Sequence, residues 1–137
     1  MTPFALLSQA CGLSHREAAE FLGVRLDTVK SWSSGRNRAP ASVLDDLRHL
    51  WAEIDFASDR AAALIGEQAA GLPIGETIEI GYPADDHEAR DLGLPCVGAW
   101  RAMCARVVAR IRNPIKLLPR GSTPALAAAA DAGEQGS

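Results

Sequence analysis

The sequence lacks the features that mark membrane, secreted and disulfide-rich proteins. No apolar run reaches the roughly 18 residues that a transmembrane helix needs, and residues 1–13 show no basic segment followed by a long apolar one. Only three cysteines are present, and no two of them form a C-x-x-C pair. An odd number of isolated cysteines excludes a disulfide scaffold and is typical of reduced thiols. We therefore expect a cytoplasmic protein without a membrane partner.

Motifs of catalysis are missing as well. The chain has neither a G-x-x-x-x-G-K-[ST] phosphate loop nor a G-x-S-x-G nucleophile turn. The carboxylates of residues 85–91 have no neighbouring base or glycine-rich segment, and the spacings of His87, Cys96 and Cys104 do not match a zinc site. We therefore predict a protein that is not an enzyme and holds no metal or cofactor, with Cys96 and Cys104 serving as small core residues.

The chain does have an ordinary apolar content and a very uneven distribution of charge. Apolar residues make up 47% of the 137 residues, which suffices for about one domain around a core. The net charge is −3, but residues 1–40 carry +2, residues 41–94 carry −9 and residues 95–137 carry +4. Because local potential governs binding to a polyanion, the basic N-terminal segment is compatible with nucleic acid.

Residues 1–38 have the pattern of three short helices separated by glycines. The second helix begins with an S-x-x-E capping box formed by Ser14 and Glu17. The third helix is expected over residues 26–34. The glycines expected to end the three helices are Gly12, Gly23 and Gly35.

A long amphipathic helix is predicted over residues 41–70. Apolar residues recur there at steps of three and four, and the opposite face is acidic. Two helices broken near Ser58 are an alternative, because a single helix of this length is unusual in a globular protein.

Beyond residue 71 the sequence predicts a small strand–helix–strand unit. Its parts are a strand at residues 77–80, a polar acidic connection at 84–91, a helix at 95–112 and a second strand at 115–118. Two strands and one helix cannot bury their apolar faces alone, so a partner protomer is expected to supply the missing layer.

The segment from His15 to Trp32 has a spacing that fixes the angle between two helices. Ala19 lies four residues before Gly23, so a methyl group allows a close helix approach and a glycine supplies the positive φ of a tight turn. Val29 and Trp32, one turn apart, are expected to face inward. A fixed steep angle would let the later helix enter a DNA major groove about 12 Å wide.

This pattern resembles the helix-turn-helix of the Cro/C1 (XRE) family of phage and bacterial regulators. Residues 13–24 are similar to the first two helical segments of that motif, and residues 29–36 are similar to its recognition helix and following turn. Arg38 and Pro40 also fit the loop that follows. The resemblance covers residues 3–52 and implies that the partner is double-stranded DNA.

The resemblance and the helical periodicity together give a candidate DNA site. Base contacts are expected from Leu26, Asp27, Lys30 and Ser31. Phosphate contacts are expected from Ser14, His15, Arg25, Arg36, Asn37 and Arg38. Other roles remain open: Asp27 as a helix cap, Lys30 as a phosphate contact and Leu26 as a packing residue. Arg25 also departs from the family pattern, in which a small polar N-cap is usual.

The predicted fold is mainly α, with a long connecting helix between two functional parts. Residues 1–52 form a helix-turn-helix DNA-binding domain, residues 53–120 a C-terminal dimerisation region and residues 121–137 a disordered tail. Its architecture and length also resemble the small anti-CRISPR-associated (Aca) autorepressors.

The expected function is sequence-specific transcriptional regulation by a homodimer. Helix-turn-helix repressors bind inverted half-sites about 34 Å apart, so we expect a repressor or autorepressor of this type. Two alternatives remain: an antitoxin-type protein whose C-terminal region binds a protein partner, and an RNA-binding regulator.

Overall fold

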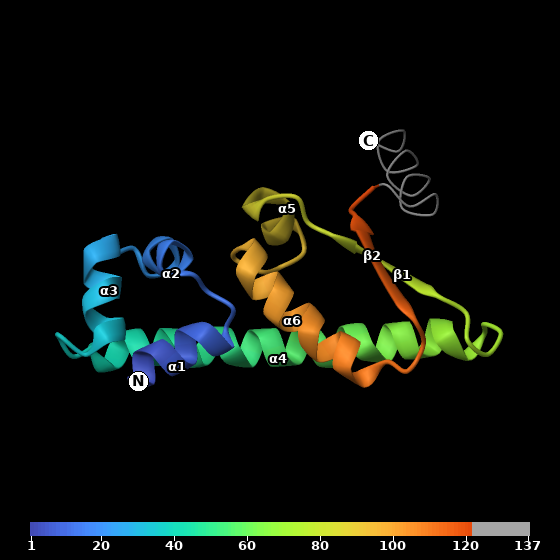
Figure 1. The fold of residues 1–137 in the computed structure, drawn as a ribbon, viewed down its shortest axis with the longest axis horizontal. Coiled ribbons are helices and arrows are strands. Elements are labelled where there is room, and N and C mark those ends of the chain that lie inside the picture. The colour runs from blue at the N-terminus through green and yellow to red at the C-terminus, as the bar shows by residue number, and fades with distance from the viewer. Residues whose placement is uncertain (122–137) are drawn as a thin grey trace.

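The computed structural model describes residues 1–121, and the predicted disordered tail lies outside these residues except for Gly121. The described chain is mainly helical, as predicted, with one small sheet (Figure 1). In chain order the elements are α1 (Pro3–Ala10), α2 (His15–Leu22), α3 (Leu26–Ser34), α4 (Ala41–Ala70), β1 (Ile78–Tyr82), α5 (Asp86–Asp91), α6 (Val97–Arg110) and β2 (Ile115–Pro119).

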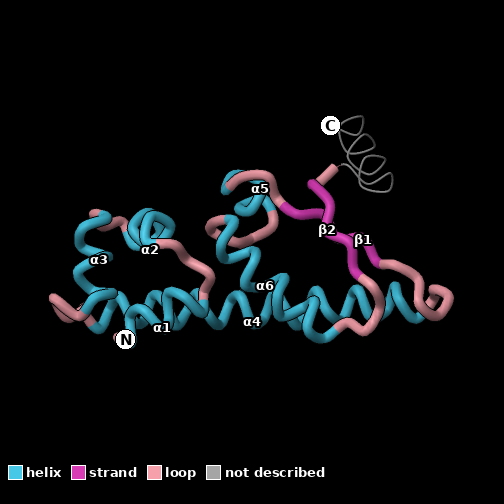
Figure 2. Tube along the Cα trace, viewed as in Figure 1, coloured by secondary structure: helices cyan, strands magenta, loops and turns pink. Residues whose placement is uncertain are grey.

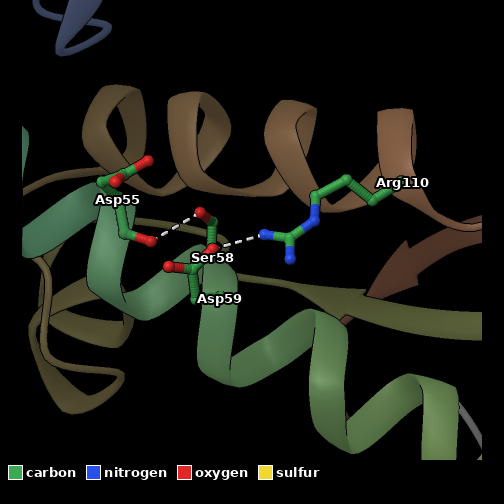
Figure 3. Close-up of polar contacts among 4 residues, drawn as sticks. All are labelled: Asp55, Ser58, Asp59 and Arg110. Atoms are coloured by element: carbon green, nitrogen blue, oxygen red, sulfur yellow. Dashed lines mark hydrogen bonds and ion pairs between the residues drawn. The ribbon is translucent and has the colours of Figure 1, made fainter.

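Helix α4 is one continuous helix of 30 residues that runs along the whole molecule, with α1 and α6 packed on it (Figure 1). The alternative of a break near Ser58 is wrong. Ser58 is 1% exposed, and its hydroxyl donates to the carbonyl oxygen of Asp55 at 2.7 Å, so the helix buries this side chain without an unsatisfied polar group (Figure 3). On the surface beside it, Asp59 pairs with Arg110 of α6.

The C-terminal unit contains the two predicted strands, which pair in parallel (Figure 2). Ile78 lies opposite Ile115, and Ile80 lies opposite Leu117. A parallel pair needs a long crossover, and α5 and α6 provide it. The prediction of a plain acidic connection at residues 84–91 is wrong, since six of these residues form α5. Asp85 caps α5 by accepting from the Glu88 N–H at 2.9 Å, and Ala89 is fully buried against the core.

A single apolar core joins the N-terminal helices to the C-terminal unit. Leu47, Leu50 and Ile54 of α4 lie at its centre. The N-terminal helices contribute Phe4, Cys11, Leu13, Ala18, Ala19, Val29 and Trp32, and the C-terminal unit contributes Leu94, Cys96, Ala99, Trp100 and Cys104. Helices α1, α2 and α3 therefore have no separate core and share one with α4 and α6.

The three cysteines are free and buried, which confirms the prediction that Cys96 and Cys104 are small core residues. Burial raises the pKa of Cys11 to about 11 and that of Cys96 to about 12. These thiols are therefore protonated at neutral pH, and a protonated thiol is a poor nucleophile. Among residues 1–121, no helix combines the length and the apolar character that crossing a membrane requires.

Candidate nucleic-acid interface

The turn between α2 and α3 has the predicted geometry. Gly23 adopts a left-handed conformation with φ of +67°, and its N–H closes the C-terminus of α2 on the carbonyl oxygens of Ala19 and Glu20. A Cβ atom at Gly23 would meet no atom within 4 Å. The backbone conformation, rather than lack of space, therefore requires glycine here. The chain turns sharply instead of continuing as one helix (Figure 1).

The inner face of α3 is buried as the spacing predicted. Val29 is 0% exposed and Trp32 is 9% exposed. The Trp32 ring meets the Phe4 ring of α1 edge to face, with 5.5 Å between the ring centroids. Ala19 of α2 is also buried, which allows the close helix approach. These contacts fix the angle at which α3 leaves the body.

Thr2 holds the other end of α3, and sequence reasoning missed this contact. Its hydroxyl accepts from the Ala5 N–H at 3.1 Å as the N-cap of α1. The same hydroxyl lies 3.2 Å from the carbonyl oxygens of Trp32 and Ser33, to which it donates. A threonine before a proline signals a helix start, but its second contact links residues about 30 positions apart and leaves no local pattern.

The outer face of α3 presents most of the predicted base-contacting residues. Asp27 and Lys30 are exposed, and Leu26 is 37% exposed. Ser31 is half-buried, and its hydroxyl accepts a hydrogen bond of 2.5 Å from the Asn37 side-chain amide. The structure thus brings Ser31 and Asn37, which were assigned to different kinds of contact, into one polar pair.

The predicted phosphate-binding residues lie at the ends of these helices. Arg25 is the N-cap of α3 and makes no side-chain capping bond, while Arg36 and Arg38 follow its C-terminus. All three arginines are exposed. Ser14 and His15 are exposed at the start of α2, where N–H groups attract anions. The ion pairs found within residues 1–121 all lie beyond residue 40, so they leave the basic groups of this region un-neutralised.

The capping box of α2 is present as predicted and makes one further contact. The Ser14 hydroxyl accepts from the Glu17 N–H at 3.1 Å, and the Glu17 carboxylate accepts from the Ser14 N–H at 3.0 Å. The same carboxylate also accepts from the Gly98 N–H of α6 at 2.9 Å. Partial burial acts to raise the pKa of Glu17, but the hydrogen bonds from these donors outweigh it and hold that pKa below its usual value.

Neither the protein-family models nor the curated proteins include a match to this chain. Across the described residues, no three His, Cys, Asp or Glu side chains gather in a group suited to a metal ion.

Proposed function

We propose that this protein is a sequence-specific DNA-binding transcriptional regulator that binds an inverted repeat as a dimer and represses the promoter that it covers. The observation that carries the proposal is the exposed outer face of α3, with basic residues at both of its ends and Val29 and Trp32 buried behind it. A protruding helix of this kind fits the width of the DNA major groove.

Each exposed group on α3 matches a feature of a base edge. Lys30 would donate to guanine O6 or N7, Asp27 would accept from cytosine N4, and Leu26 would meet a thymine methyl group. The Ser31 hydroxyl accepts from Asn37, which leaves its own proton to donate to a base or a phosphate oxygen. The phosphates of the DNA backbone on both sides of α3 would be bound by Arg25, Arg36 and Arg38.

The remainder of the chain supplies material for dimerisation. The two-stranded sheet, the C-terminal end of α5 and the C-terminal half of α4 leave large apolar side chains exposed. These side chains are Phe56, Leu64, Leu92 and Leu117. The acidic segment of residues 41–94 would repel DNA and so favour orientations in which the basic end faces the duplex.

Arg36→Ala and Arg38→Ala are expected to weaken binding to every duplex alike. If each arginine neutralises one phosphate, each substitution lowers the slope of log K against log salt concentration by about one unit. The measurement is fluorescence anisotropy of labelled duplexes over a range of salt concentrations. Arg60→Ala, which removes an exposed arginine from the distant half of α4, is the matched control and should leave the slope unchanged.

Three results would contradict the phosphate assignments or the proposed function. An unchanged salt slope in both variants would remove Arg36 and Arg38 from the phosphate contacts. Tighter binding of the unchanged protein to structured RNA than to any duplex would favour the RNA-binding alternative. A stoichiometric protein that co-purifies and prevents DNA binding would favour the antitoxin-type alternative.

A further inference from the structure

The N-terminus of α6 is closed by carboxylates from two other elements. Asp86 of α5 accepts from the Val97 N–H at 2.9 Å, and Glu17 of α2 accepts from the Gly98 N–H at 2.9 Å. The residue at the N-cap itself, Cys96, makes no side-chain capping bond. The first N–H groups of a helix have no acceptor within the helix and attract negative charge. Helix α2 is therefore tied to α6 by a charge-assisted hydrogen bond.

Glu17 serves two helices with one carboxylate. Its Oε1 atom accepts from the Ser14 N–H at the start of α2, and its Oε2 atom accepts from the Gly98 N–H at the start of α6. The relative position of the two helix ends is thus specified by bonds to a single planar group.

Two glycines bring the backbones into contact beside this carboxylate. A Cβ atom at Gly98 would lie 2.2 Å from the Gly12 carbonyl oxygen and 2.7 Å from Glu17 Oε1. A Cβ atom at Gly12 would lie 2.1 Å from the Gly98 carbonyl oxygen. Both positions exclude any side chain, so the turn before α2 sits directly on the first turn of α6.

The opposite end of α2 packs on the apolar core through Phe21 and Leu22 but also borders open space. An open cleft of about 450 Å³ lies between Phe21, near the end of α2, and the Gly93–Pro95 segment that precedes α6. The hydrogen bond that ties α2 to the C-terminal unit therefore lies at its N-terminal end, at Glu17. Because α3 follows α2 through the Gly23 turn, this attachment acts together with the Trp32–Phe4 contact to set the direction of α3 relative to α6.

We propose that Glu17 is a positioning residue that, together with the contacts of Trp32, holds α3 in one direction relative to the dimeric body and thereby narrows the half-site spacing that the protein accepts. The inference rests on the proposed function. Each base pair added between half-sites moves one of them by about 3.4 Å and turns it by about 34°. A dimer with firmly attached helix-turn-helix units accepts one spacing, and a dimer with loosened units tolerates several.

The test compares the full chain with its Glu17→Gln variant on duplexes that differ only in the number of base pairs between two half-sites. Glutamine preserves the S-x-x-Q form of the capping box, but its carbonyl oxygen replaces only one of the two carboxylate oxygens, so an NH2 group faces the N–H of either Ser14 or Gly98. The unchanged protein should prefer one spacing by about tenfold or more over spacings one base pair longer or shorter, which corresponds to about 1.4 kcal/mol. In the variant this ratio should fall to about threefold or less.

Glu20→Gln is the matched control, since it makes the same change of charge at an exposed position of the same helix. It should preserve the spacing preference of the unchanged protein. A spacing preference in Glu17→Gln that equals that of Glu20→Gln would overturn the inference. Failure of the unchanged protein to bind any spacing would instead reject the proposed function.

Hydrogen exchange of the Gly98 amide gives a readout that does not depend on DNA. Loss of a hydrogen bond to a charged acceptor should raise the exchange rate of this amide by about tenfold or more in Glu17→Gln. The exchange rate should stay unchanged in Glu20→Gln. Equal protection of Gly98 in the unchanged protein and in Glu17→Gln would show that Glu17 does not hold α6 and would overturn the inference.

Discussion

Trp32→Ala is expected to lower the free energy of unfolding by about 3–5 kcal/mol, because it removes a buried aromatic ring and leaves a cavity. The Trp32 ring packs edge to face on Phe4 and lies behind the exposed face of α3. Without the contact between the Trp32 and Phe4 rings, α3 could change its angle. Specific DNA binding should therefore disappear even where the variant remains folded. Urea unfolding followed by circular dichroism measures the change in stability.

Trp51→Ala is the matched control, since it removes the same side chain from a position that is 41% exposed. The Trp51 ring makes a cation–π contact with Arg106, with 5.5 Å from the guanidinium carbon to the ring centroid. Its removal should cost about 1 kcal/mol or less. Equal losses of stability in the two variants would mean that Trp32 does not anchor α3.

Gly12→Ala is expected to lower the free energy of unfolding by about 2–5 kcal/mol, the sum of a left-handed backbone conformation and overpacking. Gly12 has φ of +76°, and a Cβ atom there would lie 2.1 Å from the Gly98 carbonyl oxygen. That oxygen belongs to the backbone of α6, so the clash cannot be relieved by rotating a side chain. Thermal or urea unfolding measures the loss.

Gly66→Ala is the control for this substitution and should change stability in the opposite direction. Gly66 lies within α4, and a Cβ atom there would meet nothing within 4 Å. Alanine in such a position should stabilise the protein by about 0.5–1 kcal/mol. If Gly12→Ala lowers the free energy of unfolding by no more than Gly66→Ala changes it, the proposed close contact between the α1–α2 turn and α6 is contradicted.

Features of the fold that arise from neighbouring residues could be predicted from the sequence. The capping box at Ser14 and Glu17 and the turn at Gly23 each depend on residues within one or two helical turns. The inward orientation of Val29 and Trp32 follows from helical periodicity alone. The long helix was predicted at its correct length, but the sequence left open a break at Ser58 that the structure does not contain.

Features that depend on contacts between distant residues could not be predicted. The bond from Gly98 to Glu17 joins residues 81 positions apart, and the contact of Thr2 with α3 spans about 30 positions. Helix α5 escaped prediction because it has six residues, most of them polar, and is held by the burial of Ala89 against the core. Short polar helices are stabilised by tertiary packing rather than by their own propensity.

The residues of the candidate site also fall into two groups, those whose positions follow from local sequence and those whose positions depend on contacts outside their own helix. Helical periodicity correctly placed Asp27 and Lys30 on the exposed side of α3. It also placed Ser31 there, whereas the structure shows Ser31 half-buried and bonded to Asn37. The segment that follows Gly35 folds back on α3, and that return could not be derived from the periodicity of the helix itself.

Selection of bound duplexes from a random library tests the central claim most directly. If α3 reads the major groove from a two-fold dimer, the selected sequences should converge on an inverted repeat with half-site centres about 34 Å apart, or one helical turn. Protection of guanine N7 from methylation should then fall within both half-sites, because N7 faces the major groove. Recovery of sequences without a common motif, or of a motif protected only in the minor groove, would contradict the account.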